Sequence, residues 1–400
     1  MSDLSVAQPI TAYSALAEAQ FQVELFDTLQ AAEAIWRSLE ARAVLTPYQG
    51  YDWITALLAA GAEQNSRVAV VVIRQAEHVV ALLPLGLRNR RGLLEAHMLG
   101  TGQSNADWLM AEPGFAPNKA DLHRIFALVG QAIGGVDLLS LSNLPRSWNG
   151  HANPLLVFDH ALAPSNLYTA TIGPTPAPYI DHRLSAKRRS NINRGRRRLV
   201  EQHGEVRLVR VRDEAMLARV HAAFIEQRGA RFAEMGIPNM FAEKPFYKLF
   251  GDLTRSGFAH DHPTLCLHAL LAGDEIVATS WGLHGGTHYS QYINSTTSGP
   301  AARYSLMGIL IAELMDALTV IGVLTFDMGL GDFEYKTEWT EAQPVFNAQI
   351  ALSFKGRVAA RAKARLQAGK RLIKQTPALW NAAQWTRKKI FDLRAKRPKL

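Results

Sequence analysis

The sequence predicts a mixed α/β fold of the α+β type, with two similar halves in tandem and a basic helical tail at the end of the chain. Three observations predict it: 400 residues of which 48% are hydrophobic, an order of strand and helix patterns that occurs twice, and a change to strong positive charge after residue 354. At roughly 150 residues per domain this length fits two domains, and the apolar content is enough for a sizeable core.

The first occurrence of the pattern begins with a hairpin. Residues 70–85 contain two β-rich runs joined by a short polar turn, which is typical of antiparallel pairing. A short strand is expected at 96–99, a helix at 119–133 and a further strand at 135–141.

The second occurrence follows about 190 residues later. Residues 267–281 form a hairpin pattern around a Gly-Asp turn. A strand at 287–294, a helix at 305–320 with apolar residues at helical spacing, and a strand at 322–328 complete it. The shared order and spacing favour a duplicated unit, and a coincidence between common α+β units is the alternative.

The expected boundaries follow from this repeat. We expect an N-terminal half at 20–152, a linker at 153–182, a C-terminal half at 183–354 and a basic helical tail at 355–400. The linker is rich in proline, and residues before proline avoid helical geometry, so the linker is expected to cross between the halves in extended form.

The charge of the chain is concentrated in its tail. Residues 355–400 hold fifteen Lys and Arg and one acid, a net +14 out of the chain's total of +9, so the rest carries −5. The second of two expected helices, which are broken near Thr376-Pro377, places apolar and aromatic residues between its charges. Such a helix is typical of peripheral contact with an anionic membrane, and a helix docked on the body is the alternative.

Several classes of protein are not expected. The single cysteine, Cys266, excludes a disulfide within the chain and a cysteine-based zinc site. The histidines show no metal-binding spacing, so no metal is expected. The N-terminal residues lack a signal-peptide pattern and no apolar run is long enough to span a membrane, so we expect a cytoplasmic protein, with membrane association through the tail.

One segment resembles a known family. Residues 327–339 read D-M-G-L-G-D-F-E-Y-K-T-E-W, which is similar to the D-x-G-x-G-D-x-x-Y-K-x-x-W signature of the CelD/BcsL-like acetyltransferases of the GNAT superfamily. The basic stretch at 185–194 and the T-P-Y-Q-G-Y-D-W stretch at 46–53 resemble two weaker motifs of that family. The tandem arrangement also resembles the FemABX peptidyltransferases.

The resemblance implies two GNAT-like domains, with the chemistry in the C-terminal one, because the N-terminal half has no counterpart of the 327–339 motif. It implies transfer of an acyl or acetyl group from acyl-CoA to an amine or hydroxyl acceptor, a small molecule or envelope precursor, in cellulose or exopolysaccharide biosynthesis. The alternatives are FemABX-like aminoacyl transfer from tRNA and a non-catalytic assembly factor. Nucleic acid other than tRNA is not an expected partner.

A GNAT enzyme must hold the diphosphate of its donor, and the N-terminus of a helix is a natural anion site. The expected donor site is the start of the helix at 305–320. Ser305 is expected to cap the helix and Gly308 to let the backbone approach the phosphates. The predicted donor-binding residues are Arg303, Tyr304, Ser305, Met307 and Gly308. An ordinary helix start after a Gly-Pro turn is the alternative.

The reaction also needs an acid for the leaving thiolate and a base for the acceptor. Tyr335 is the expected acid, because GNAT enzymes often place theirs after the corresponding strand. Asp332 and Glu334 are candidate bases if burial raises their pKa. His288 and Tyr289 lie on a neighbouring strand, where only one of two adjacent residues can face the substrate.

Further residues of the motif are expected at the acceptor. The predicted substrate-binding residues are Asp327, Gly329, Gly331, Lys336 and Trp339. The two glycines after an apolar strand indicate a tight turn or a close approach of another chain. Lys336 is expected to pair with an acid or to hold an anionic group, and Trp339 to pack or to stack on substrate. The basic run at 183–198 is either a solvated helix or a contact for phosphates or tRNA.

Overall fold

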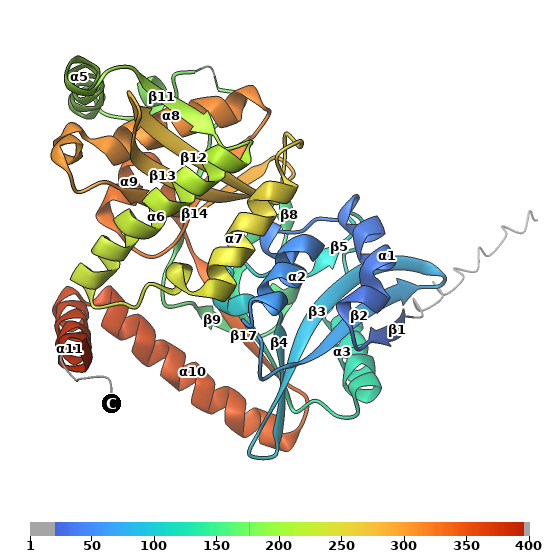
Figure 1. The fold of residues 1–400 in the computed structure, drawn as a ribbon. Coiled ribbons are helices and arrows are strands. Elements are labelled where there is room, and N and C mark those ends of the chain that lie inside the picture. The colour runs from blue at the N-terminus through green and yellow to red at the C-terminus, as the bar shows by residue number, and fades with distance from the viewer. Residues whose placement is uncertain (1–20, 176, 396–400) are drawn as a thin grey trace, which may run out of the picture.

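The computed structural model describes residues 21–175 and 177–395. It contains two mixed β-sheets, each with helices on both faces, and a pair of C-terminal helices that runs along one side of the molecule (Figure 1). The predicted fold class is thereby confirmed.

The first sheet has the strand order β1-β2-β3-β4-β6-β17-β9, with β5 attached to β3. Its two faces are covered by α1 (Leu29–Glu40) and α2 (Tyr51–Ala59) on one side and by α3 (Lys119–Ile133) on the other. Val70 and Val72 pack toward α1 and α2, whereas Val71 and Ile73 pack toward α3, as alternation along a strand requires. Its strands are β1 (Phe21–Phe26), β2 (Arg67–Gln75), β3 (His78–Arg90), β4 (Leu93–Met98), β5 (Met110–Ala111), β6 (Leu138–Pro145), β9 (His160–Leu162) and β17 (Val345–Ala351).

The second sheet has the order β11-β12-β13-β14-β15-β10-β16. One face packs on α6 (Glu214–Met235) and α7 (Lys244–Ser256), and the other on α5 (Ala186–His203) and α8 (Leu306–Val320). The strands are β10 (Leu167–Thr171), β11 (Val206–Arg210), β12 (Leu265–Ala272), β13 (Glu275–Gly285), β14 (His288–Thr296), β15 (Thr325–Leu330) and β16 (Glu341–Gln343), and short helices are α4 (Ile180–Arg183), η5 (Pro300–Tyr304) and α9 (Glu334–Trp339).

The two sheets share the predicted order of elements. In the first, the hairpin β2–β3 is followed by antiparallel β4, then α3, then β6 parallel to β4. In the second, the hairpin β12–β13 is followed by antiparallel β14, then α8, then β15 parallel to β14. The helix expected at 119–133 has those bounds, and the one expected at 305–320 begins one residue later.

Strand pairing differs from the expected boundaries at two places. The segment 345–351, expected in the C-terminal half, is β17 and pairs with β6 of the first sheet. The segment 153–182, expected as an extended linker, contains β9 of the first sheet and β10 of the second. A short alternating strand has the same apolar pattern whichever sheet it joins, so the local sequence does not specify its partner.

The segment 46–53 lies at the junction of the two halves. The Tyr48 hydroxyl lies 2.5 Å from the Ser290 hydroxyl of β14, and the rings of Trp53 and Tyr292 are 5.4 Å apart. Tyr292 also donates a hydrogen bond to Gln103. This junction aligns the first half with the strand on which the candidate site is built.

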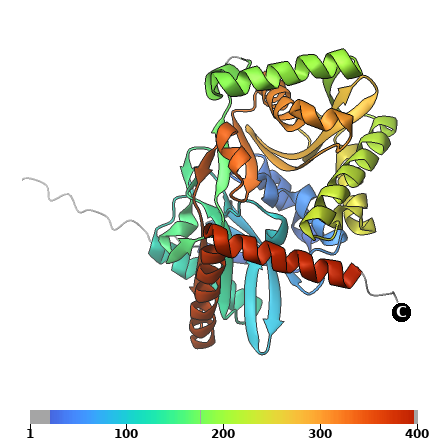
Figure 2. The ribbon, with the colours of Figure 1, turned by 90° about the vertical axis from the view of Figure 1, so that its left-hand side faces the viewer.

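The tail forms the two predicted helices, α10 (Phe354–Gln375) and α11 (Pro377–Ala395), which meet in a bend at Thr376 (Figure 2). α10 lies along β6, β9 and β17, and α11 reaches α6. Within the described residues, no helix is both long and apolar enough to cross a bilayer.

Candidate active site

The site begins where β14 and β15 separate. These strands pair in parallel only through His288–Ser290 and Thr325–Asp327, although β14 continues to Thr296 and β15 to Leu330. Beyond the paired residues their backbone groups no longer bond to each other, and the strands open into a wedge. A polar ligand can therefore reach backbone donors and acceptors that a continuous sheet would use internally.

A cavity of about 650 Å³, which we call the wedge cavity, occupies this opening. Its walls come from both faces of the sheet, because α6 lies on one face and the start of α8 on the other. The lining residues used below are Arg188 of α5; Gln227, Arg228, Arg231 and Glu234 of α6; Asn294 of β14; Met307 and Gly308 of α8; Gly329 of β15; and Tyr335, Lys336 and Trp339 of α9.

The first turn of α8 opens toward the wedge cavity without a cap of its own. Ser305 has a left-handed backbone (φ +58°) and makes no side-chain cap bond, so the predicted capping role is wrong. The first turn contains no acidic residue. Since the first amide groups of a helix lack internal acceptors, this end is an electropositive wall.

Two of the five predicted donor-binding residues, Met307 and Gly308, line the wedge cavity. A Cβ on Gly308 would lie 3.1 Å from Ile192 and 3.4 Å from the Arg188 guanidinium, so this glycine lets α5 pack close to α8. Arg303 is exposed and lies over the ring of Tyr304, and neither they nor Ser305 are among the lining residues.

The basic run at 183–198 is largely consumed by ion pairs. Arg183 pairs with Glu341, Arg196 with Glu313, and Arg188 with Glu338. Arg188 is the member of the run that also lines the wedge cavity. Its place beside Gly308 puts a cation at the α8 end of the site.

Tyr335 and Lys336 of α9 both line the wedge cavity. Burial raises the pKa of Tyr335, against the effects of a hydrogen bond with Asn294 and the charge of Arg228, so the phenol is protonated at neutral pH. Burial lowers the pKa of Lys336 to about 8 despite the nearby charges of Asp327 and Asp332. The Lys336 ammonium donates to the carbonyls of Gly329 (3.2 Å) and Leu330 (2.9 Å).

Asp327 does not line the wedge cavity, contrary to its predicted contact with substrate. It is fully buried, where its carboxylate accepts from Ser290 (2.8 Å) and the Gly329 amide (2.8 Å) and lies 2.6 Å from His288 Nε2. This group continues through Ser290 to Tyr48 in the other half. The carboxylate therefore joins the halves and fixes the turn after β15.

Asp332 and Glu334, the predicted bases, also lie outside the lining of the wedge cavity. Asp332 accepts from the side chains of Asn166 (2.9 Å), Tyr168 (3.0 Å) and Gln375 (2.9 Å), so it ties the segment before β10 and α10 to the turn. Glu334 is exposed in the first turn of α9. Because the Asp332 carboxylate already accepts these hydrogen bonds, it has no lone pair directed at an acceptor substrate.

His288 and Tyr289 are both buried away from the wedge cavity, so the expectation that one of them faces substrate is wrong. His288 stacks on Trp148 with ring centroids 4.0 Å apart, and Tyr289 stacks on Phe326. The two side chains alternate between the faces of the sheet as predicted, but each face is packed at that position.

The remaining motif residues shape the wall. Gly329 has φ +69°, and a Cβ there would lie 2.7 Å from the Asn105 side chain, so the predicted close approach of another segment is confirmed at this glycine. Gly331 also has positive φ, at +109°, but it is not among the lining residues. Trp339 is buried and lines the wedge cavity, so it is both a packing anchor and part of the wall.

The sequence analysis missed the α6 contribution. Arg228 lines the wedge cavity and donates from Nη1 to the Asn294 carbonyl (3.3 Å). It lies more than 100 residues before Tyr335 in a segment with no motif, so no local signal marked it.

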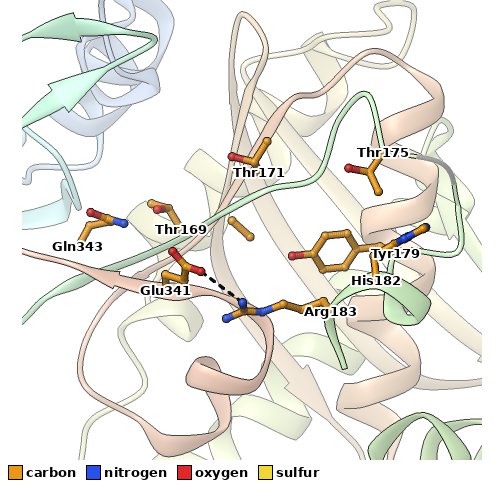
Figure 3. A pocket seen from close by; sticks show the side chains of 9 residues that line it. Thr169, Thr171, Thr175, Tyr179, His182, Arg183, Glu341 and Gln343 are labelled. Atoms are coloured by element: carbon orange, nitrogen blue, oxygen red, sulfur yellow. Dashed lines mark hydrogen bonds and ion pairs between the residues drawn. The ribbon is translucent and has the colours of Figure 1, made fainter. Parts of the chain in front are cut away.

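A second, smaller cavity of about 320 Å³ lies against β10 and β16 (Figure 3). Threonine side chains, Tyr179 and the Arg183–Glu341 ion pair line it. The Tyr179 hydroxyl donates to the Trp339 carbonyl (3.3 Å), so this residue adjoins the wall of the wedge cavity from behind. The Arg183 charge is already paired here with Glu341.

Known proteins are similar to part of the sequence and to the fold. Residues 186–337, from α5 into α9, match the family model of the acetyltransferase (GNAT) domain. The fold is similar to that of FemX, with a TM-score of 0.53 and 9% identity over 82% of this chain and 97% of that one. It is also similar to a conserved protein of unknown function from Bacteroides thetaiotaomicron, with a TM-score of 0.51 and 10% identity over 83% and 100% of the chains. No curated protein matches the chain.

Proposed function

We propose that the chain transfers an acyl group from acyl-CoA to an amine or hydroxyl acceptor. The observation that carries the proposal is the wedge cavity, which joins an uncapped helix start on one face of the sheet to a half-exposed tyrosine and a buried lysine at the strand ends. The GNAT domain match of the same residues supports it, since such domains typically use acetyl-CoA.

The donor would enter from the α8 side. The first-turn amides of α8 and the Arg188 guanidinium provide donors for the diphosphate. The thioester would then lie between β14 and β15, near Asn294 and Gly329. The donor phosphates are assigned to the α8 side because the first turn of α8 has no acidic residue that would repel them.

In the proposed reaction the acceptor nitrogen or oxygen attacks the thioester carbonyl, a new C–N or C–O bond forms, and the C–S bond breaks. The neutral Tyr335 hydroxyl donates its proton to the departing thiolate, the proton that the acceptor nitrogen or oxygen loses passes to solvent, and Tyr335 regains one from solvent. The Lys336 ammonium, held at the wall by two carbonyls, stabilises negative charge that develops on the carbonyl oxygen.

The described residues that line the wedge cavity include one carboxylate, Glu234, and no histidine. Glu234 is paired with Arg231 at 2.8 Å. We therefore propose that an amine acceptor arrives unprotonated and needs no dedicated base. The reaction rate should then rise with pH as the amine loses its proton.

A thermal-shift titration of the whole chain tests the donor. Acetyl-CoA should raise the melting temperature in a concentration-dependent manner. The variant Arg188→Gln should weaken this binding about tenfold, the usual cost of one charge-assisted contact. Arg194→Gln is the matched control, since Arg194 lies on the same helix but bonds to Asn191. Equal affinities of the two variants would remove Arg188 from the donor site.

The alternatives are judged by the same assay. FemX-like aminoacyl transfer is kept because of the fold similarity, which by itself concerns the fold alone. If a panel of acyl-CoAs leaves the melting temperature unchanged and charged tRNA binds, that alternative replaces the first. If the cellular phenotype survives both Tyr335→Phe and Lys336→Met, an assembly factor without catalysis is the better description. The CelD/BcsL-like assignment and a place in polysaccharide or envelope synthesis stay predictions.

A further inference from the structure

Arg228 differs from the other cations of the wedge cavity because, among the described residues, it has neither a carboxylate partner, as Arg188 and Arg231 have, nor two carbonyl acceptors, as Lys336 has. Its Nε is buried without a hydrogen-bond partner, and its pairing with the described part of the chain is limited to the Asn294 carbonyl and the Phe232 ring. Burial lowers the pKa of its guanidinium to about 10, with smaller effects from Tyr335 and Arg231, so it stays charged at neutral pH. A partly buried cation without a counter-ion, whose Nε is fully buried, is costly and is a candidate for ligand binding.

Its neighbours show the contrast. Arg188 pairs with Glu338 at 2.9 Å and Arg231 with Glu234 at 2.8 Å. Lys336 is bonded to two carbonyls. Arg228 therefore has the largest unused capacity to bind an anion among these four cavity-lining residues.

The position of Arg228 separates it from the proposed donor phosphates. It belongs to α6, on the face of the sheet opposite α8 and Arg188. Its charge acts on the Tyr335 hydroxyl, and both residues interact with Asn294, so it lies next to the reacting end of the proposed donor. An anion at Arg228 would thus be part of the molecule that enters from the α6 side.

We propose that the acceptor carries an anionic group, a carboxylate or phosphate, and that Arg228 binds it beside Tyr335. The identification of the anionic molecule as the acceptor rests on the proposed acyl transfer, but the anion site itself does not depend on it. The guanidinium would use its unpaired N–H groups for a charge-assisted contact with the anion.

The test titrates inorganic phosphate and succinate into the full chain, with and without saturating CoA, by calorimetry. Both anions should bind to the CoA-loaded protein, and Arg228→Gln should weaken them at least about tenfold. Arg228→Lys, which keeps the charge but loses the planar fork, should fall between. Arg219→Gln, on the same helix but outside the wedge cavity and bonded to the Asp274 carbonyl, is the matched control and should bind like the unaltered protein.

The outcomes separate the sources of the anion. One outcome is that phosphate binds only in the absence of CoA and that Arg228→Gln weakens the binding of CoA as much as that of phosphate. In that case the site belongs to the donor and the proposal is overturned. Equal anion binding by the unaltered chain and Arg228→Gln, or no anion binding by either, also overturns it. If CoA fails to bind while phosphate still depends on Arg228, the acyl-CoA function fails and the anion site stands.

A second, independent observation concerns the tail. Nine large hydrophobic side chains on α10 and α11 are exposed, as many as on all the other described residues together. Phe354 is 72%, Leu366 67% and Trp385 65% exposed. The nine are Phe354, Val358, Leu366, Leu372, Ile373, Leu379, Trp385, Ile390 and Leu393.

These side chains lie on the solvent side of each helix. α10 is held to the first half by buried Gly356, by Lys363 to Glu95 and by Lys374 to Ser165. At 3.6 residues per turn, Phe354, Val358 and Leu372 of α10 fall on the opposite side from these anchors, and Leu366 and Ile373 fall to one side of them. The helix therefore exposes apolar side chains to solvent and contacts the first half through polar ones.

Basic residues flank the apolar row. The two helices contain twelve Lys and Arg and one acid, Asp392, and Lys389 lies over the exposed Trp385 ring. We infer that the outer face of α10 and α11 docks on an anionic lipid bilayer. A second copy of this face would carry the same positive charge, which opposes self-association.

Co-sedimentation with vesicles tests this inference. The full chain should bind vesicles containing about one-third phosphatidylglycerol, bind pure phosphatidylcholine at least about tenfold less, and dissociate as salt rises. Trp385→Ser with Leu366→Ser should release it, whereas Val320→Ser, at a still more exposed apolar residue on α8, should not. Equal binding to neutral vesicles, no binding at all, or salt-sensitive binding to duplex DNA in place of vesicles would overturn the inference. So would self-association of the unaltered chain that the double variant abolishes without any effect on vesicle binding.

Discussion

The two halves have the same strand order but differ at two places that decide whether a ligand can enter. In the first half, α3 is capped by Asn118, whose side chain accepts from the amides of Ala120 and Asp121. The Asp121 carboxylate in turn accepts from the Asn118 amide. In the second half, α8 begins with neither a side-chain cap nor an acid. One helix start is satisfied internally, and the other is left for an external anion.

The strand ends differ in the same way. In the first half, the loop after β4 bonds to β6, because Asn143 donates to the Ser104 carbonyl (3.2 Å) and accepts from the Asp107 amide (3.2 Å). In the second half, β14 and β15 part around the wedge cavity. A duplicated fold thus supports a scaffold and a candidate active site through local changes at one helix start and one loop.

Acid should separate the halves with the largest effect. The second half buries His221, His268 and His284, and burial lowers their pKa values to about 4, 3 and 3. The unfolded chain takes up these protons near pH 6.5 while the folded chain does not. Their stability contribution is present above pH 6.5 and is lost as pH falls, by at most about 4 kcal/mol per pH unit for the three.

The first half responds differently in that window. Burial would raise the pKa of Glu63, but hydrogen bonds from His97 and Ser66 outweigh it and lower the pKa to about 2, so this contribution is lost only below about pH 4.5. Burial raises the pKa of Asp107 to about 6, which strengthens the folded form as pH falls. Hydrogen exchange at pH 7 and 5, corrected for intrinsic rates, should show lost protection in β12 and β13 and retained protection in β2 and β3. His284→Leu should reduce the difference and His123→Leu, at an exposed position, should not; equal loss in both sheets would contradict the comparison.

Removal of the proposed acid is the next largest change. Tyr335→Phe should lower the turnover of acetyl-CoA with an acceptor amine about 100-fold and leave acetyl-CoA affinity unchanged, because the lost hydroxyl acts on the leaving thiolate. Steady-state kinetics and calorimetry measure the two quantities. Tyr247→Phe, at another half-exposed tyrosine, is the control. Unchanged turnover would place the chemistry elsewhere.

The open helix start can be made to resemble the closed one. Met307→Glu introduces an acid into the first turn of α8, as Asp121 does in α3. Its carboxylate should repel the donor phosphates and weaken acetyl-CoA binding at least about tenfold, while the melting temperature is unchanged or slightly raised by the favourable dipole interaction. Met307→Gln is the isosteric control and should bind normally. Normal binding by Met307→Glu would mean that the phosphates lie away from α8.

Replacement of the residue that caps α3 should have the smallest effect, a change in the free energy of unfolding. Asn118→Ala should lower the free energy of unfolding by about 1 kcal/mol, because it removes the acceptor for two amides. Ser305→Ala should change it by less than about 0.5 kcal/mol, because Ser305 makes no cap bond. Paired urea titrations of the two variants provide the measurement, and a reversed order would break the comparison.

The sequence by itself determined the elements and their repeated order. Alternating apolar runs with Gly-Asp or polar turns specified the hairpins, and apolar spacing specified α3 and α8 almost to the residue, because these signals depend on neighbours within one or two turns. The motif at 327–339 also marked the end of β15, where Tyr335, Lys336 and Trp339 line the wedge cavity, and the break between the two tail helices at Thr376-Pro377 was visible in the sequence.

The tertiary structure alone decided which side chains meet. Within one motif of thirteen residues, Tyr335 and Lys336 line the wedge cavity, whereas Asp327 and Asp332 bond to Ser290, Asn166 and other distant groups. Arg228 lines the same cavity from α6, and β17 pairs with the first sheet and not with the second. Local pattern determines the backbone, but the direction of a side chain at a strand end or turn depends on what packs against it from elsewhere in the chain. The close approach of Asn105 to Gly329 is one such contact, and no short segment encodes it.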